Sequence, residues 1–266
     1  MRSAADLKGI LHRIDGRGYK AYRDIQGQYD CGTYILFVDH VQGDPFASPS
    51  KVRVQVPQRV AEFPRDTFRS KSREVALRDF LTRRFLEASR RFCKGTRGIG
   101  TSGTIVIDRP RQEILERTSA FVTEEYVEAR FVMGLPAFGR RIAARHAEDM
   151  FFEELPRIVQ ASLIKENLSE KILRKHIQTA EDADFLRDRL NHLGLVALVA
   201  DGAILPRASG VDPRPLTEGR VVPFESPESL RMEVELPNRG TITGMGIPKG
   251  ITLIVGGGYH GKSTLL

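Results

Sequence analysis

Hydrophobic and polar residues in the first part of the chain follow strand-like and then helix-like patterns. A run of β-branched and aromatic residues at 34–38 is typical of a buried strand, and valines that alternate with polar residues at 52–56 indicate a half-buried one. From Ser72 to about Phe92, apolar residues recur with the spacing of one helical face. That face consists of Leu77, Leu81, Ala88 and Phe92.

The following segment returns to strand patterns and ends in a helix. Three strands are predicted near 104–108, 113–118 and 126–133, and a helix over about 139–155 that stops before Pro156. No repeat of fixed period appears. We therefore expect residues 1–165 to form one α+β domain.

The second half begins with a helix, capped by Thr179 or Asp182 and ended by Gly194. Two short strands should follow it, joined by the hairpin signal Asp201-Gly202. A long proline-rich surface connection comes next.

The last part of the chain reads as strands separated by tight turns. Residues 232–236 and 241–244 are predicted to pair through a turn at 237–240. After a second turn at 246–250, the apolar strand 251–255 leads directly into a glycine-rich loop.

That loop, GGGYHGKS at 256–263, matches the phosphate-binding pattern G-x-x-x-x-G-K-[ST], the Walker A motif. Glycines let the backbone wrap around a phosphate so that several N–H groups converge on it. Lys262 would reach the β- and γ-phosphates of ATP, and the Ser263 hydroxyl would bind Mg²⁺. The residues expected to bind the nucleotide are Gly256, Gly257, Gly258, Gly261, Lys262, Ser263 and Thr264.

The context of the loop favours one class of P-loop protein. Small-molecule kinases and GTPases usually open on the P-loop strand, whereas ABC-type ATPases place antiparallel strands before it. The strand pair predicted at 232–244, and the residues STLL after the lysine, favour the ABC type. A P-loop kinase is therefore the weaker alternative.

Taken as a whole, the chain resembles the ATPases of the ABC class. Five segments carry the resemblance, namely IDGRGYKAYRDIQGQYD, DHVQGDPFASPSKVRV, RGIGTSG, MGIPKG and GGGYHGKSTLL. The resemblance implies an α+β N-terminal domain at 1–165 and, at 166–266, the beginning of an ABC-type α/β nucleotide-binding domain that ends at the Walker A motif. It also implies ATP and Mg²⁺ as ligands and a homodimer in the full-length protein.

The resemblance further implies a Walker B acidic pair and a signature-like motif beyond Leu266. We therefore expect this chain to be a truncated fragment, and ATP hydrolysis only in the full-length protein. No catalytic residue is assigned. Tyr259 and His260 stand where most ABC loops carry glycine and a small residue, so we expect the loop path to differ locally and give neither residue a role.

Charge suggests a second function. The net charge is +7, and residues 59–97 alone hold twelve Lys/Arg against five Asp/Glu, a balance of 12 − 5 = +7. RNA or DNA binding through this segment is the alternative function, with a solvated helix face as the plain interpretation. The nucleic-acid candidates on the helix, expected to face outward, are Arg73, Arg83, Arg84, Arg90 and Arg91, and those on the adjoining loop are Lys94 and Arg97.

The remaining signals limit the compartment and exclude other chemistry. Two cysteines far apart in sequence, and no signal peptide or apolar stretch of about 18 residues, predict a cytoplasmic protein without a membrane span. The glycines of GIGTSG at 98–103 follow a helix and precede a strand, which is the wrong order for a dinucleotide site. We expect a tight turn there, or a basic loop that meets phosphates.

Overall fold

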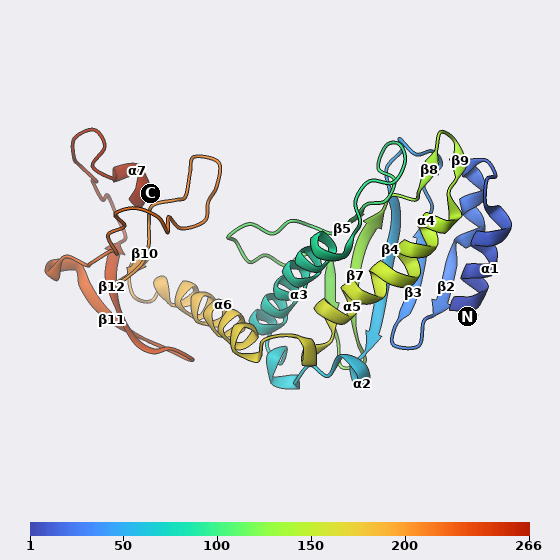
Figure 1. Ribbon diagram of the computed structural model, residues 1–266. Coiled ribbons are helices and arrows are strands. Elements are labelled where there is room, and N and C mark those ends of the chain that lie inside the picture. The colour runs from blue at the N-terminus through green and yellow to red at the C-terminus, as the bar shows by residue number, and fades with distance from the viewer. The chain divides into compact units, whose positions relative to one another are not determined.

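The computed structural model describes residues 1–266, which form two compact units (Figure 1). The first unit comprises Met1–Pro110 and Leu115–Arg174, and the second comprises Arg111–Ile114 and Lys175–Leu266. The division falls inside helix α6 (Glu170–Leu190), nine residues after the boundary expected at 165/166. That boundary stays a prediction, and each unit is described by itself.

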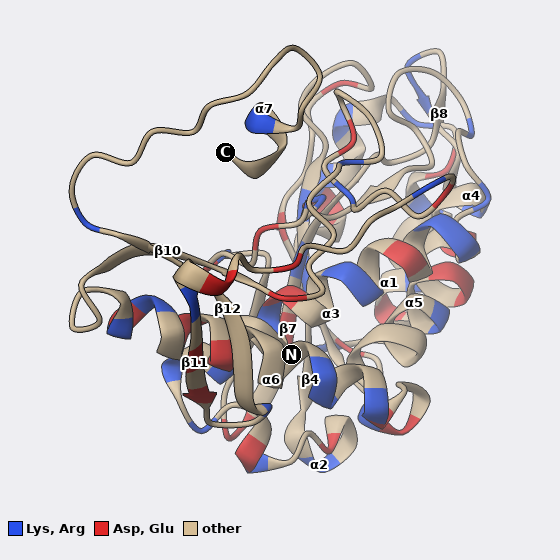
Figure 2. Ribbon diagram, turned by 90° about the vertical axis from the view of Figure 1, so that its left-hand side faces the viewer, with Lys and Arg blue, Asp and Glu red and all other residues tan.

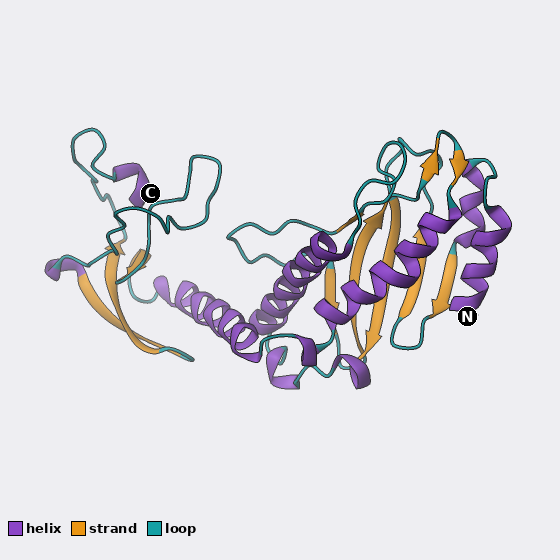
Figure 3. Ribbon diagram, in the orientation of Figure 1, coloured by secondary structure: helices purple, strands orange, loops and turns teal.

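The first unit is built on a seven-stranded sheet with the order β1-β2-β3-β4-β7-β5, in which β6 also pairs with β7 (Figure 3). β1 is parallel to β2, and the other neighbours are antiparallel. The strands are β1 (Arg2–Ser3), β2 (Gly27–Asp30), β3 (Ile35–His40), β4 (Ser50–Pro57), β5 (Ile105–Val106), β6 (Ala120–Val122) and β7 (Tyr126–Met133). A separate two-stranded ribbon pairs β8 (Ala137–Phe138) with β9 (Arg141–Ile142).

Helices cover one face of this sheet (Figure 1). They are α1 (Ala4–Ile14), α3 (Lys71–Phe92), α4 (Ala144–Asp149) and α5 (Leu155–Leu163). The short α2 (Gln58–Ala61) lies at the end of β4, and 3₁₀ turns occur at Tyr19–Ile25, Arg65–Thr67 and Lys165–Asn167. Phe85 of α3 packs on Phe131 of β7 with ring centroids 4.9 Å apart, and both side chains are buried. Such aromatic pairs add about 1 kcal/mol to what burial alone contributes.

Strand β4 has the predicted half-buried pattern. Val52, Val54 and Val56 are buried against the helices, and Arg53 and Gln55 lie on the other face. The alternation gave the correct strand because its period of two matches the pleat.

Two strand predictions in this unit need correction. The strand expected at 104–108 is reduced to Ile105–Val106, and residues 113–118 form no strand. Arg78 explains the second case in part, because its guanidinium donates to the carbonyl of Arg117. The Arg78 side chain therefore occupies a carbonyl that would otherwise accept a hydrogen bond from a neighbouring strand, and β6 begins only at Ala120.

The helix near Pro156 was also placed wrongly. It begins at Ala144 and continues past Pro156 to Leu163, with a π-helical segment at Met150–Glu154. A proline lacks the N–H that the helix interior requires. The wider π turn immediately before it, and its place in the first turn of α5, accommodate the missing donor without ending the helix.

The second unit holds an antiparallel three-stranded sheet with the order β10-β12-β11. Its elements are most of α6, β10 (Leu195–Ala200), the 3₁₀ turn Glu228–Leu230, β11 (Arg231–Leu236), β12 (Gly240–Pro248) and α7 (Lys262–Leu265). The predicted β11–β12 hairpin is confirmed. Asp182 of α6 holds its turn by accepting from the backbone N–H groups of Asn238 and Arg239 at 2.9 and 3.1 Å.

Other expectations for this unit are wrong. The helix starts at Glu170, well before the caps proposed at Thr179 and Asp182. The Asp201-Gly202 turn joins no hairpin, since β10 pairs with β12 instead. The Asp201 carboxylate accepts from both the N–H and the hydroxyl of Ser226, which ties the turn to a distant segment.

The apolar segment 251–255 does not form a strand either. Ile251 and Leu253 are 103% and 81% exposed, and the segment pairs with none of β10, β11 and β12. A strand needs a neighbour to bond its backbone groups, so an apolar pattern alone cannot make one.

Candidate phosphate-binding site

The glycine-rich loop at 256–261 connects the extended segment 251–255 to α7. Gly261 and Tyr259 both have left-handed backbone angles, with φ of +79° and +62°. Glycine adopts this conformation freely, whereas for a bulky residue it is uncommon. Tyr259 therefore takes the conformation that usually favours glycine, and its ring is fully exposed. That the loop path differs from the path of other ABC loops stays a prediction.

The polar groups of the loop turn toward one another. The Lys262 ammonium donates to the carbonyl of Gly256 at 2.7 Å and also to that of Gly257. The Gly257 N–H donates to Nδ1 of His260 at 3.1 Å. The loop therefore folds back on itself around its own lysine and histidine.

The donor set suits a polyphosphate. An ammonium and a backbone N–H from a loop with space around its glycines are the groups that bind phosphate oxygens. A Cβ added at Gly258 or Gly261 would meet nothing within 4 Å, so the loop has open space on its outer side. The exposed Ser263 hydroxyl makes no hydrogen bond within the chain and offers one oxygen ligand that Mg²⁺ accepts.

All seven residues expected at the nucleotide lie together on this loop and the first turn of α7. No Asp or Glu makes a hydrogen bond or ion pair with any of them. The site as it stands supplies groups that bind phosphate, without a carboxylate to complete a metal shell or to position an attacking water.

Comparison with known families defines the class of the protein. Residues 4–166 match the family model for the N-terminal part of ATPases of the ABC class, and residues 169–266 match the model for the P-loop domain of the ABC-class ATPases. The chain belongs to the ABC-class ATPase family, which confirms both the resemblance and the fold class predicted from the sequence. No curated protein matches the chain.

The structure changes the interpretation of the basic segment. Arg73 was expected to face outward but is buried, where its guanidinium donates to the carbonyl of Asp66 at 2.9 Å. Arg83 donates through Nε to the buried carboxylate of Asp79 at 2.6 Å. The helical spacing placed these arginines off the apolar stripe but did not reveal the acidic groups that pair with them. Figure 2 shows basic and acidic positions interleaved over the helices.

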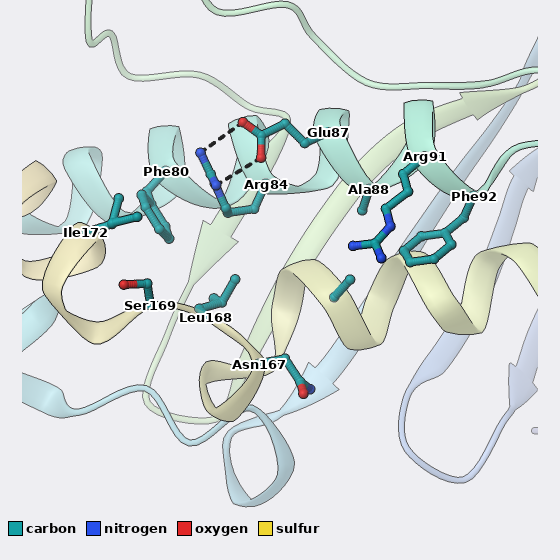
Figure 4. Close-up of a pocket in the computed structure, with 11 residues that line it drawn as sticks. Phe80, Arg84, Glu87, Ala88, Arg91, Phe92, Asn167, Leu168, Ser169 and Ile172 are labelled. Atoms are coloured by element: carbon teal, nitrogen blue, oxygen red, sulfur yellow. Dashed lines mark hydrogen bonds and ion pairs between the residues drawn. The ribbon is translucent and has the colours of Figure 1, made fainter.

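Arg84 and Arg91 border a cavity of about 180 Å³ between α3, α5 and the start of α6 (Figure 4). Arg84 pairs with Glu87 through two contacts of 2.9 and 3.0 Å. Arg91 lies over the ring of Phe92, 5.1 Å from its centroid, and makes no ion pair. Phe92, expected in the core, is only half-buried and lines the same cavity.

The two basic residues of the following loop are also neutralised. Lys94 lies 3.4 Å from both Asp149 and Glu153, and Arg97 pairs with the buried carboxylate of Glu154. Of the seven nucleic-acid candidates, Arg90 and Arg91 are exposed without an ion pair. The predicted band of outward cations is therefore reduced to two residues at the end of α3.

The outer face of the sheet is balanced in the same way. Glu128, with 2% exposure, accepts hydrogen bonds from Gln55, Arg53 and Arg130. Burial would raise the pKa of the Glu128 carboxyl, but these hydrogen bonds outweigh it and hold the pKa below its usual value. The buried carboxylate thus stays ionised and, together with Asp39, which accepts from Arg53 at 2.9 Å, balances the charge of the two arginines.

Sequence reasoning gave His260 no role, yet its ring contacts the loop backbone. The available signal was its size, because an imidazole at a position that usually holds a small residue must lie either in solvent or over the loop. No helix is both long and apolar enough to cross a membrane.

Proposed function

We propose that this chain binds ATP, with Mg²⁺, through the loop at 256–264. The observation that supports the proposal is that, within one short loop of a P-loop family member, Lys262 donates to two carbonyls of the loop and the Gly257 N–H donates to a side chain, partners that phosphate oxygens can replace. Lys262 would exchange its two carbonyl partners for phosphate oxygens, and Ser263 would hold the metal ion.

Binding should be weak and unaccompanied by hydrolysis. The loop offers one cation and one hydroxyl, and no carboxylate contacts it, so we expect a dissociation constant on the order of millimolar. Phosphoryl transfer to water requires a carboxylate for the metal and a group that positions the water. ATP hydrolysis is proposed for the protein only when those groups are present.

The test is a titration of the chain with ATP in the presence of Mg²⁺, in which binding is monitored by the NMR chemical shifts of the loop glycines. We expect Lys262→Ala to weaken binding at least tenfold, since hydrogen bonds to charged groups contribute about 1.5–3 kcal/mol. Lys249→Ala is the matched control, because Lys249 is also in the second unit but donates to Asn191. Equal affinities for the wild type and Lys262→Ala would refute the proposal.

ATP turnover is an independent test of the proposal that this chain does not hydrolyse ATP. Phosphate release from ATP should stay at background for the wild type. Steady release that Lys262→Ala abolishes would mean that this chain alone completes a catalytic site.

Nucleic-acid binding receives less support and is not proposed. Most of the candidate cations pair with Asp or Glu, and an ion pair must be broken before its cation can contact a phosphate backbone. A homodimer and a cytoplasmic location stay predictions from the sequence.

A further inference from the structure

The phosphate-binding loop holds its own substitute for a ligand. Its Gly257 N–H, a backbone donor of the kind that P-loops direct at phosphate, is taken by Nδ1 of His260. Its cation, Lys262, is taken by the carbonyls of Gly256 and Gly257. A phosphate that uses both donors must therefore displace these internal partners.

The backbone at Tyr259 brings the imidazole to this position. A left-handed residue between Gly257 and His260 reverses the chain, so that the histidine side chain returns over the loop that precedes it. A Cβ on Gly257 would lie 3.0 Å from Cε1 of His260, so the ring packs closely over this glycine. Because the Tyr259 ring touches nothing, no packing of that side chain holds the turn.

We propose that His260 is an internal competitor of the nucleotide phosphates, occupying the Gly257 N–H until phosphate displaces it. The inference rests on the proposed function, and it assigns to His260 the control of phosphate affinity. Displacement costs the loop one hydrogen bond, which sets the size of the effect.

Protonation should weaken this competition. A neutral imidazole accepts a hydrogen bond at Nδ1, whereas an imidazolium donates at both nitrogens and cannot accept from Gly257. Lys262 is the charged residue of the loop, and its ammonium is held by the Gly256 and Gly257 carbonyls, without a carboxylate partner. Acidification therefore frees the Gly257 N–H and adds a positive charge beside the bound phosphate.

The test compares pyrophosphate binding by three variants at about pH 8 and about pH 5.5, on either side of the range in which imidazoles usually titrate. His260→Ala removes the competitor, and His260→Asn keeps an acceptor that does not titrate. His40→Ala is the matched control, since His40 is exposed and belongs to the first unit. Each variant is compared with the wild type at the same pH, so that pyrophosphate has the same protonation state in both measurements.

At about pH 8, we expect His260→Ala to bind pyrophosphate about two- to tenfold more tightly than the wild type, which corresponds to one net hydrogen bond. At about pH 5.5 the wild type should equal or exceed the alanine variant. At about pH 8, His260→Asn should bind pyrophosphate as weakly as the wild type does. At about pH 5.5, it should bind pyrophosphate no more tightly than the wild type.

Two readouts keep this inference separate from the proposed function. In the protein without ligand, the ¹⁵N shift of His260 Nδ1 should show an acceptor nitrogen at about pH 8. If His260→Ala binds no more tightly than the wild type at that pH, the competition does not exist. If Lys262→Ala leaves pyrophosphate binding unchanged, the proposed function itself fails, whatever His260 does.

Discussion

Two glycine-rich segments of this chain, 94–103 and 256–261, look alike in sequence and differ in physical purpose. In the first, glycine is required because backbone packs directly on backbone. A Cβ at Gly98 would lie 2.1 Å from the carbonyl oxygen of Ala137, and one at Gly100 would lie 2.2 Å from that of Pro45. In the second, Gly258 and Gly261 have nothing within 4 Å.

The difference shows that glycine content alone does not identify a binding loop. The first segment is closed, and its basic residues are paired with carboxylates, so it serves the fold. The second is open, with a lysine held by carbonyls that a ligand can replace. Of the two expectations for 98–103, the tight turn is confirmed, and its basic residues do not stand free for phosphates.

The largest effect should come from Gly98→Ala. The added methyl group meets a backbone oxygen, and the φ of +121° at this residue suits only glycine, so we expect a loss of at least about 3 kcal/mol. Urea unfolding of the whole chain, followed by a signal from the first unit, measures this loss in the free energy of unfolding. Gly9→Ala is the control, because Gly9 lies in α1 with nothing within 4 Å of its Cβ position, and alanine there should be neutral or stabilising.

A somewhat smaller loss is expected for Arg97→Ala. This change leaves the carboxylate of Glu154, with 1% exposure, buried without its partner, at a cost of about 3 kcal/mol. Arg140→Ala should cost less than about 1 kcal/mol, since Arg140 is exposed and lies 3.7 Å from Asp44. Equal losses for the two variants would show that the Arg97 pair is not a structural requirement.

The smallest effect on stability should come from Gly258→Ala. Its Cβ has open space, so we expect a change within about 0.5 kcal/mol. If the loop holds phosphate, the same variant should bind ATP more weakly, because the methyl group narrows the space around the anion. Urea unfolding and nucleotide titration of this variant would thus distinguish a glycine needed for binding from one needed for packing. A large loss of stability for Gly258→Ala would contradict that difference between the two loops.

Local patterns predicted the parts of the fold that depend on local physics. The alternation in β4, the run in β7 and the hairpin of β11 and β12 were all readable from the sequence, since a buried face imposes a period of two. The phosphate-binding motif was readable as well, because its chemistry needs fixed spacing.

What failed depends on partners that lie outside the segment's own pattern. The burial of Arg73 follows from the carbonyl of Asp66, in the turn just before α3, and the missing strand at 113–118 follows from the contact of Arg78 with the carbonyl of Arg117. The exposed state of 251–255 follows from the lack of a neighbouring strand. None of these partners is encoded in the periodicity of the segment itself.

The hold of Asp182 on the β11–β12 turn has a consequence for hydrogen exchange. Hairpins commonly fray from their loosest end, and an unsupported turn opens at little cost. Here the backbone N–H groups of Asn238 and Arg239 donate to the carboxylate of Asp182 in α6, a residue that is only 6% exposed. These two turn amides should therefore exchange with solvent as slowly as the strand amides beside them, and the hairpin should open first at its other end, where Arg231 pairs with Met245.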